Sequence, residues 1–126
     1  MRTPLNNETV DTPSPSTRTA LIALDGIADG SFAETEAVIT GDAESLILYR
    51  QGDAVRAWLN ICPHAGRRLD WAPGQFLKSK EGLLVCAAHG ASFELMRGEC
   101  VGGPCRGEAL RVVPVEVRDG QVWLAP

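Results

Sequence analysis

Hydrophobic residues occur in short runs that Gly, Asp and other polar residues separate. The runs, from residue 21 onward, are LIAL, SLILYR, AVRAWLNIC, GLLVC, ASFEL, VVPVEV and QVWL. Apolar runs of this length, bounded by turn-forming residues, are typical of β-strands. No segment shows a sustained helical repeat, and residues 35–39 fit a strand as well as a turn of helix. The pattern therefore predicts an all-β fold.

Two connections between these runs predict β-hairpins. The sequence QGD at 51–53 separates two strand-like runs, and DG at 119–120 separates PVEVR from QVWL. Glycine readily adopts the positive φ that a tight hairpin turn requires. Before the second turn, Val113, Val115 and Val117 alternate with polar or proline positions. This alternation predicts an antiparallel strand with one face toward a core.

The first 18 residues differ from the rest of the chain. They are rich in Thr, Ser, Pro and Asn and have few large apolar side chains, so burial cannot offset the entropy of ordering them. We expect a disordered tail over residues 1–18 and one domain over residues 19–126. A chain of 126 residues with 44% hydrophobic residues has the size and composition of one compact domain.

Charge and the start of the chain limit the partners and the compartment. A net charge of -4 and a pI near 5.1 argue against general nucleic-acid binding. No stretch approaches the roughly 20 apolar residues that span a bilayer, and MRTPLNNETV has no signal-peptide pattern. We therefore expect a cytoplasmic protein without membrane association. In a reducing compartment, cysteines favour metal binding or catalysis over a disulfide framework.

The two histidines of the chain each follow a cysteine. Cys62 and His64 form a C-x-H motif, and after 21 intervening residues Cys86 and His89 form a C-x-x-H motif. Short spacings within each loop let two side chains reach one metal centre. For either motif alone, a buried thiol beside an unrelated histidine is a sufficient explanation. Two such motifs in one chain favour a metal site instead. Structural zinc is a second metal interpretation, although zinc fingers usually group their two cysteines together and their two histidines together.

One sulfur and one nitrogen ligand in each motif suit a Rieske centre, in which two histidines replace two cysteines on one of the two irons. CPHAGRRLDW and VCAAHGASFEL resemble the two cluster-binding loops of the Rieske family. The segment GECVGGPCRGEALRVVPVEVRDGQVWL resembles the hairpin, proline loop and last strands of that family. The resemblance covers about residues 21–124. It implies an antiparallel β-sandwich that carries a smaller cluster-binding subdomain, made of two loops and a proline loop.

The resemblance also implies one [2Fe-2S] cluster and roles for particular residues. The implied ligands are Cys62 and Cys86 on the inner iron, and His64 and His89 on the outer, solvent-facing iron. Gly66 and Gly90 would bring backbone amides close to the cluster sulfurs, because a β-carbon there would crowd the loop. Pro104 would form the tip of the loop that shields the cluster from water. An ordinary surface turn is the alternative for these three residues.

Four positions depart from the Rieske proteins of cytochrome bc1 complexes. Arg67 and Ala88 stand where those proteins have the cysteines of a bridging disulfide, so that bridge cannot form here. Ala91 and Phe93 stand where those proteins have a serine and a tyrosine that donate hydrogen bonds to the cluster. Fewer donors favour the oxidised cluster. We therefore expect a reduction potential toward the low end of the Rieske range of about -150 to +300 mV.

Several features lie outside the implied ligand set. Cys100 and Cys105 suit buried small side chains, with additional ligands or a redox pair as alternatives. Residues 71–81 look like an insertion between the two loops. Trp71 is expected in the core, although exposure beside His64 would offer an apolar docking contact.

Charges near the implied cluster differ from those of the whole chain. Residues 65–106 contain six basic and four acidic side chains, although the chain as a whole is acidic. We expect this locally basic end to dock on an acidic partner, with an ordinary solvated surface as the alternative.

The function implied is that of an electron carrier, not of an enzyme. With no further histidine, the chain cannot form the two-histidine, one-carboxylate iron site of an oxygenase α subunit. No hydrolase, Walker or dinucleotide motif is present. We expect a monomer that passes single electrons from a reductase to an oxygenase or another acceptor. The alternatives are a cluster-bearing subunit or redox sensor held in a larger complex, and a zinc-binding structural module.

Overall fold

Short β-strands make up the regular structure, as the hydrophobic pattern predicts. The computed structural model describes residues 19–63, 66–88 and 90–125, so the tail predicted over 1–18 lies outside the described residues. The elements are β1 (Ala20–Ala23), the 3-10 helix η1 (Leu24–Gly26), β2 (Phe32–Ile39), β3 (Asp42–Gln51), β4 (Ala54–Leu59), β5 (Leu77–Lys78), β6 (Leu84–Val85), β7 (Ser92–Phe93), β8 (Cys100–Gly102), β9 (Val115–Arg118) and β10 (Gln121–Leu124). The all-β prediction is confirmed. The ambiguous segment 35–39 belongs to strand β2.

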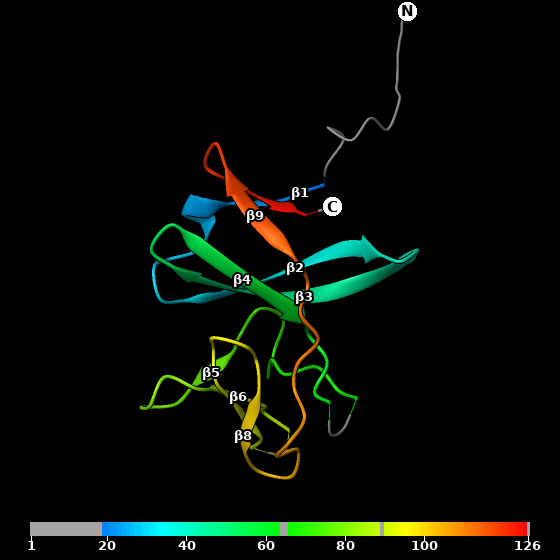
Figure 1. The fold of residues 1–126 in the computed structure, drawn as a ribbon, viewed down its shortest axis with the longest axis vertical. Coiled ribbons are helices and arrows are strands. Elements are labelled where there is room, and N and C mark those ends of the chain that lie inside the picture. The colour runs from blue at the N-terminus through cyan, green and yellow to red at the C-terminus, as the bar shows by residue number, and fades with distance from the viewer. Residues whose placement is uncertain (1–18, 64–65, 89, 126) are drawn as a thin grey trace, which may run out of the picture.

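The strands form three antiparallel sheets in the orders β1-β10-β9, β2-β3-β4 and β5-β6-β7-β8. Figure 1 shows the long strands β2, β3 and β4 across the middle of the molecule, with β1 and β9 on one side and β5, β6 and β8 on the other. The smaller four-stranded sheet and the loops around it form a separate end of the molecule. This arrangement agrees with the predicted sandwich that carries a small subdomain.

Strand β3 is buried on both faces. Successive residues of a strand point to opposite sides, and Leu46, Ile47 and Leu48 are all fully buried. Leu46 and Leu48 belong to a core shared with the β1-β10-β9 sheet. Ile47 belongs to a second core, here called the cluster-side core. Its buried members are Ile47, Tyr49, Trp58, Cys62, Leu69, Leu84, Cys86, Ala91, Phe93, Cys100, Cys105 and Leu110.

Both predicted hairpins are present. Strand β3 pairs with β4 up to the turn at 52–53, and β9 pairs with β10 around the turn at 119–120. The valine alternation is only partly reproduced. Val113 is buried, but it precedes β9, and Val115 and Val117 are half-buried because β9 lies at the edge of its sheet.

A buried amide side chain connects the central sheet to the first cysteine loop. Asn60 directly follows β4 and is 1% exposed. Its Oδ1 accepts a hydrogen bond from the Leu69 amide at 2.9 Å, and its Nδ2 donates to Ser45 Oγ at 3.1 Å. The Asn60 amide also donates to the Ser45 carbonyl at 2.9 Å. Asn60 therefore fixes the segment after Cys62 against strand β3.

Replacing Asn60 by alanine tests this connection. Asn60→Ala leaves the buried Leu69 amide without its acceptor, so we expect the free energy of unfolding to fall by about 2 kcal/mol. Urea unfolding followed by tryptophan fluorescence measures the loss. Ser45→Ala is the matched control. It keeps the bond to Leu69, and the Asn60 side chain keeps its hydrogen bond to Asp70, so the cost should be less than about 1 kcal/mol. Equal losses in the two variants would contradict this role of Asn60.

Candidate metal centre

Cys62 and Cys86 lie in two loops that close in the same way. The Gly66 amide donates to the Cys62 carbonyl at 2.8 Å, and the Gly90 amide donates to the Cys86 carbonyl at 2.9 Å. In the reverse direction, the amides of both cysteines donate at 2.7 Å to the carbonyls five residues later, in Arg67 and Ala91. Backbone hydrogen bonds within each loop therefore fix both the amide and the carbonyl of its cysteine. The two loops form a matched pair.

Gly66 and Gly90 make these closures possible through their backbone conformation. Their φ angles are 68° and 74°, in the left-handed region that favours glycine. A β-carbon added at either position meets no described heavy atom within 4 Å. Crowding by the described residues is therefore not the reason for glycine here, in contrast to the reason expected from the sequence.

Both cysteine residues are buried at the base of the loops that carry them. Cys62 is 0% exposed and Cys86 is 1% exposed, and both belong to the cluster-side core. The Ala87 amide donates to the Leu69 carbonyl at 3.1 Å, which joins the second loop to the segment after the first. Neither cysteine forms a disulfide. Two buried thiols in adjoining loops fit the sulfur ligands of one iron of an iron-sulfur cluster.

The two histidines predicted as ligands, His64 and His89, lie outside the described residues. They occupy the second and third positions after their cysteines, within the same two loops. No group of three or more metal-ligating side chains was found among the residues that the structure does describe. The described residues therefore include the two predicted sulfur ligands and not the two predicted nitrogen ligands.

A third loop packs on the second cysteine loop. It contains Gly103 and Pro104, and a β-carbon at Gly103 would lie 2.9 Å from Cα of Ala91 and 3.3 Å from the Gly90 carbonyl oxygen. This close contact places the third loop against the second cysteine loop, and the shielding role of Pro104 stays a prediction. The proline itself is exposed.

Cys100 and Cys105 flank this third loop and form a disulfide. We expected them first as buried small side chains, and both are buried. The bond between them corresponds to the alternative of a redox pair. The five-residue separation was the available signal. The expectation of a reducing compartment argued against this interpretation, because disulfides are rare there.

An ionised carboxylate fixes the chain after the first loop. Burial tends to raise the pKa of Asp70, but hydrogen bonds from Arg68, the Gly74 amide and Asn60 outweigh it, so the pKa lies below its ordinary value. The Arg68 guanidinium binds both Asp70 oxygens, at 3.0 and 2.7 Å, and lies 3.7 Å from Glu34 of β2. Arg68 therefore belongs to an ion-pair network that joins this loop to the central sheet.

The segment predicted as an insertion, residues 71–81, has structure of its own. It contains β5, which pairs with β6. Lys78 reaches the central layer, where its Nζ donates to the Gly30 carbonyl at 3.0 Å and lies 5.2 Å from the centre of the Tyr49 ring. Trp71 is 61% exposed, so the expectation that it packs in the core was wrong. The backbone of Trp71 closes a small turn with Gln75 instead.

A family model described as the Rieske [2Fe-2S] domain matches residues 24–117. The chain belongs to the Rieske family. As a Rieske domain, it carries one [2Fe-2S] cluster. No helix within the described residues is long and apolar enough to cross a membrane. A search of curated proteins found no match.

Solved structures of Rieske ferredoxins share this fold. The ferredoxin of carbazole 1,9a-dioxygenase from Nocardioides aromaticivorans IC177 is 25% identical, with 86% of this chain and 97% of that chain covered and a TM-score of 0.67. A chain in a complex of reduced oxygenase and oxidised ferredoxin in carbazole 1,9a-dioxygenase is 27% identical, with 86% and 92% covered and a TM-score of 0.65. The terminal oxygenase from Nocardioides aromaticivorans IC177 is 25% identical, with 86% and 29% covered and a TM-score of 0.67.

Serine substitutions test the two buried cysteines as ligands. We expect Cys62→Ser and Cys86→Ser each to lower bound iron to below about a tenth of the wild-type content, because a hard hydroxyl oxygen replaces a soft thiolate poorly. Iron and sulfide analysis of the purified variants measures this. The double variant Cys100→Ala/Cys105→Ala is the control and, with no chelator present, should keep its iron. Wild-type iron in Cys86→Ser would contradict the assignment.

Proposed function

We propose that this Rieske domain passes single electrons from a reductase to an oxygenase or a similar redox acceptor. Its family and its similarity to ferredoxins support the role of an electron carrier. The observation that supports it most strongly is the pair of identically closed loops around two buried cysteines. The match over 97% of a dioxygenase ferredoxin supports an oxygenase system as the destination of the electrons.

The proposed ligands are Cys62 and Cys86 for the inner iron, and His64 and His89 for the outer iron. Burial of the two cysteines supports the inner position. Gly66, Ala88 and Gly90, which stand close to the histidines in sequence, are exposed, and this supports an outer iron near solvent. When bound, the cluster supplies a one-electron couple. The chain keeps the sulfurs away from water and places the histidine-bearing loops at its surface.

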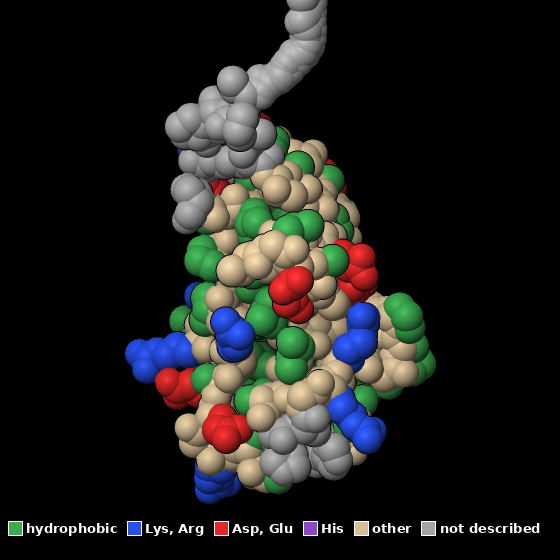
Figure 2. Space-filling view, turned by 90° about the vertical axis from the view of Figure 1, so that its right-hand side faces the viewer, with side chains coloured by type: hydrophobic (Ala, Val, Ile, Leu, Met, Phe, Trp, Pro, Cys, Tyr) green, Lys and Arg blue, Asp and Glu red, His purple; other side chains and the backbone are tan. Residues whose placement is uncertain are grey.

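Charge around this end supports docking on an acidic partner. Arg67 and Arg106 are exposed near the three loops, whereas Arg68 is held by Asp70. Arg97 is exposed beside Gly98, in a turn that packs on Trp58 of β4. Figure 2 shows Lys and Arg side chains gathered on the half of this face that belongs to the cluster subdomain, with acidic side chains among them. Complementary charge increases the rate of encounter more than the strength of the complex.

Substitution of this chain for a known ferredoxin tests the carrier role. The assay contains a reductant that does not reduce the oxygenase directly and the terminal oxygenase of the carbazole 1,9a-dioxygenase system, with this chain in place of its ferredoxin. We expect this chain to reduce the oxygenase over many turnovers, because a mobile carrier dissociates after each transfer. Cys86→Ser is the inactive control. No reduction, under conditions where the system's own ferredoxin works, would contradict the proposal, as would permanent association in size-exclusion chromatography.

The same assay tests docking by charge. We expect the transfer rate to fall about threefold as ionic strength rises from about 0.02 to 0.2 M, because salt screens exposed charges. Arg67→Gln should weaken this dependence. Arg118→Gln, at the β9-β10 turn on the far side of the central sheet, should leave it unchanged. Rates that do not respond to salt would exclude steering by charge.

The reduction potential depends on the hydrogen bonds that reach the cluster. Ala91 and Phe93 are fully buried and carry no hydroxyl, so we expect a potential near the low end of the Rieske range, about -150 mV. Ala91→Ser adds a donor and should raise the potential by some tens of mV, on the order of the effect of one hydrogen bond. Ser92→Ala is the control, because Ser92 Oγ donates to the Gly90 carbonyl at 3.4 Å. Protein-film voltammetry measures the reduction potential of each variant. A wild-type potential near +300 mV would contradict this prediction.

A further inference from the structure

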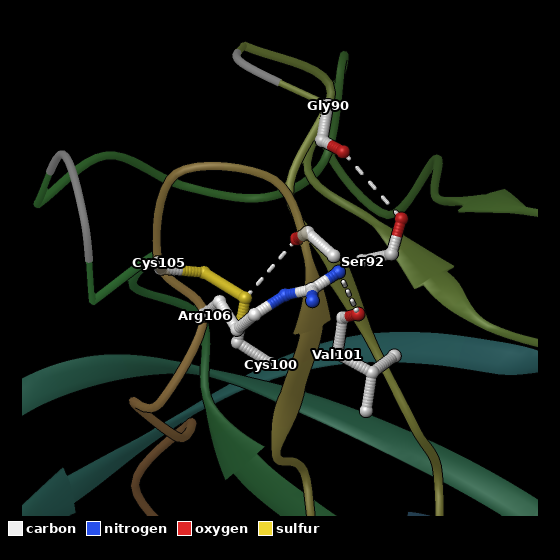
Figure 3. Close-up of a disulfide and its surroundings, with 7 residues drawn as sticks. Gly90, Ser92, Cys100, Val101, Cys105 and Arg106 are labelled. Carbon is white, nitrogen blue, oxygen red and sulfur yellow. Dashed lines mark hydrogen bonds between the residues drawn. A yellow bond between two sulfur atoms is a disulfide. The ribbon is translucent and has the colours of Figure 1, made fainter.

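The disulfide between Cys100 and Cys105 closes the loop that covers the second cysteine loop. Their Cα atoms are 5.9 Å apart. Figure 3 shows the bond beneath this loop, with Gly90 and Ser92 of the neighbouring segment on its other side. Cys100 begins strand β8, which pairs with β7, whereas Cys105 lies in the turn that follows. The bond therefore ties the far side of the loop to the small sheet.

Hydrogen bonds also hold the far side of this loop. The Cys100 amide of β8 donates to the Glu108 carbonyl at 2.8 Å, and Glu99 forms a β-bridge with Ala109. The Arg106 amide approaches the Gly103 carbonyl at 3.4 Å, and the Glu108 amide donates to the Cys105 carbonyl at 2.9 Å. The Arg106 side chain donates to the Val101 carbonyl at 3.2 Å. Beyond the pairing of Gly102 with Ser92, the contact of the loop with the second cysteine loop is the packing of Gly103. The covalent bond adds to these contacts, because it joins Cys105 in the turn of the loop directly to strand β8.

One of the two cysteines of the disulfide lines a hollow in the surface. Glu99, Cys100, Gly107, Glu108 and Ala109 line a depression of about 250 Å³. Cys105 is 2% exposed and is enclosed by the core. An attacking thiolate needs access to one sulfur of a disulfide. Cys100 is 5% exposed and lines the depression, so it is the more accessible of the two cysteines.

The same site accommodates the reduced form. Sγ of Cys100 lies 3.2 Å from the carbonyl oxygen of Gly102, so a thiol at this position has an acceptor for its proton. Cys105 lies in an apolar core, where a small neutral thiol packs well. Neither sulfur needs the bond in order to remain buried.

We propose that Cys100 and Cys105 form a thiol-disulfide exchange site that takes a dithiol as its reductant, and that this site controls how tightly the loop closes over the cluster. One thiolate of the dithiol attacks Sγ of Cys100, the bond between the two cysteines breaks, and the Cys105 thiolate takes up a proton. The second thiol of the reductant then releases Cys100 as a thiol. Two electrons and two protons pass to the protein, and the dithiol becomes a disulfide.

The exchange itself is tested by peptide mass. Trypsin cleaves after Arg97 and Arg106, so Cys100 and Cys105 share one peptide, 98–106, while Cys62 and Cys86 fall on two others. The folded, cluster-loaded protein is incubated with or without dithiothreitol, quenched in acid, denatured and alkylated. We expect no label on peptide 98–106 without dithiothreitol and two labels after it. Two labels without reductant, or none after treatment of the folded protein, would overturn the proposal.

The effect on loop closure is tested by release of iron to a chelator, and this part rests on the proposed function. We expect dithiothreitol to accelerate release from the wild type by about threefold or more, because loss of a covalent constraint increases local opening. Cys100→Ala/Cys105→Ala should release iron at the accelerated rate with or without dithiothreitol, and it controls for effects of the dithiol on the cluster itself. Equal rates in all samples would overturn this control of closure. If the proposed cluster is wrong, no iron is present to release, but the peptide result is unaffected.

Discussion

Two backbone closures, one around Cys62 and one around Cys86, are the constraint on which this structure depends. Each cysteine receives a hydrogen bond on its carbonyl and donates one from its amide, so the position of each side chain is set by the loop rather than by neighbouring side chains. A cluster of two irons needs ligands from both loops at once. The remainder of the fold serves to hold these two loops together.

The central sheet provides the surface against which the loops pack. Because β3 is buried on both faces, one face supports the cluster-side core while the other anchors the β1-β10-β9 sheet. Asn60 and the ion pair of Arg68 with Asp70 then fix the segment after Cys62 to this sheet. Buried and hydrogen-bonded polar groups of this kind give the loop one defined position.

The sequence predicted the parts of the structure that depend on local signals. The two hairpin turns, the all-β class and the pairing of Cys62 with Cys86 in one core followed from glycine positions, short apolar runs and ligand spacing. Strand β2 was not assigned, because its sequence FAETEAVI places charged residues among small ones, and its strand form depends on pairing with β3. The exposure of Trp71 and the Cys100–Cys105 bond depend on which distant segments meet, and a general expectation for tryptophan or for a cellular compartment did not contain that information.

The fold alone does not distinguish a carrier from part of an oxygenase, since the chain is similar both to ferredoxins and to 29% of a terminal oxygenase. The ligand set therefore decides the chemistry, and pulsed electron paramagnetic resonance of the dithionite-reduced protein examines it most directly. The account predicts one paramagnetic [2Fe-2S] centre whose unpaired electron couples to two imidazole nitrogens, from His64 and His89. A colourless protein that holds zinc, or a cluster without nitrogen coupling, would contradict it.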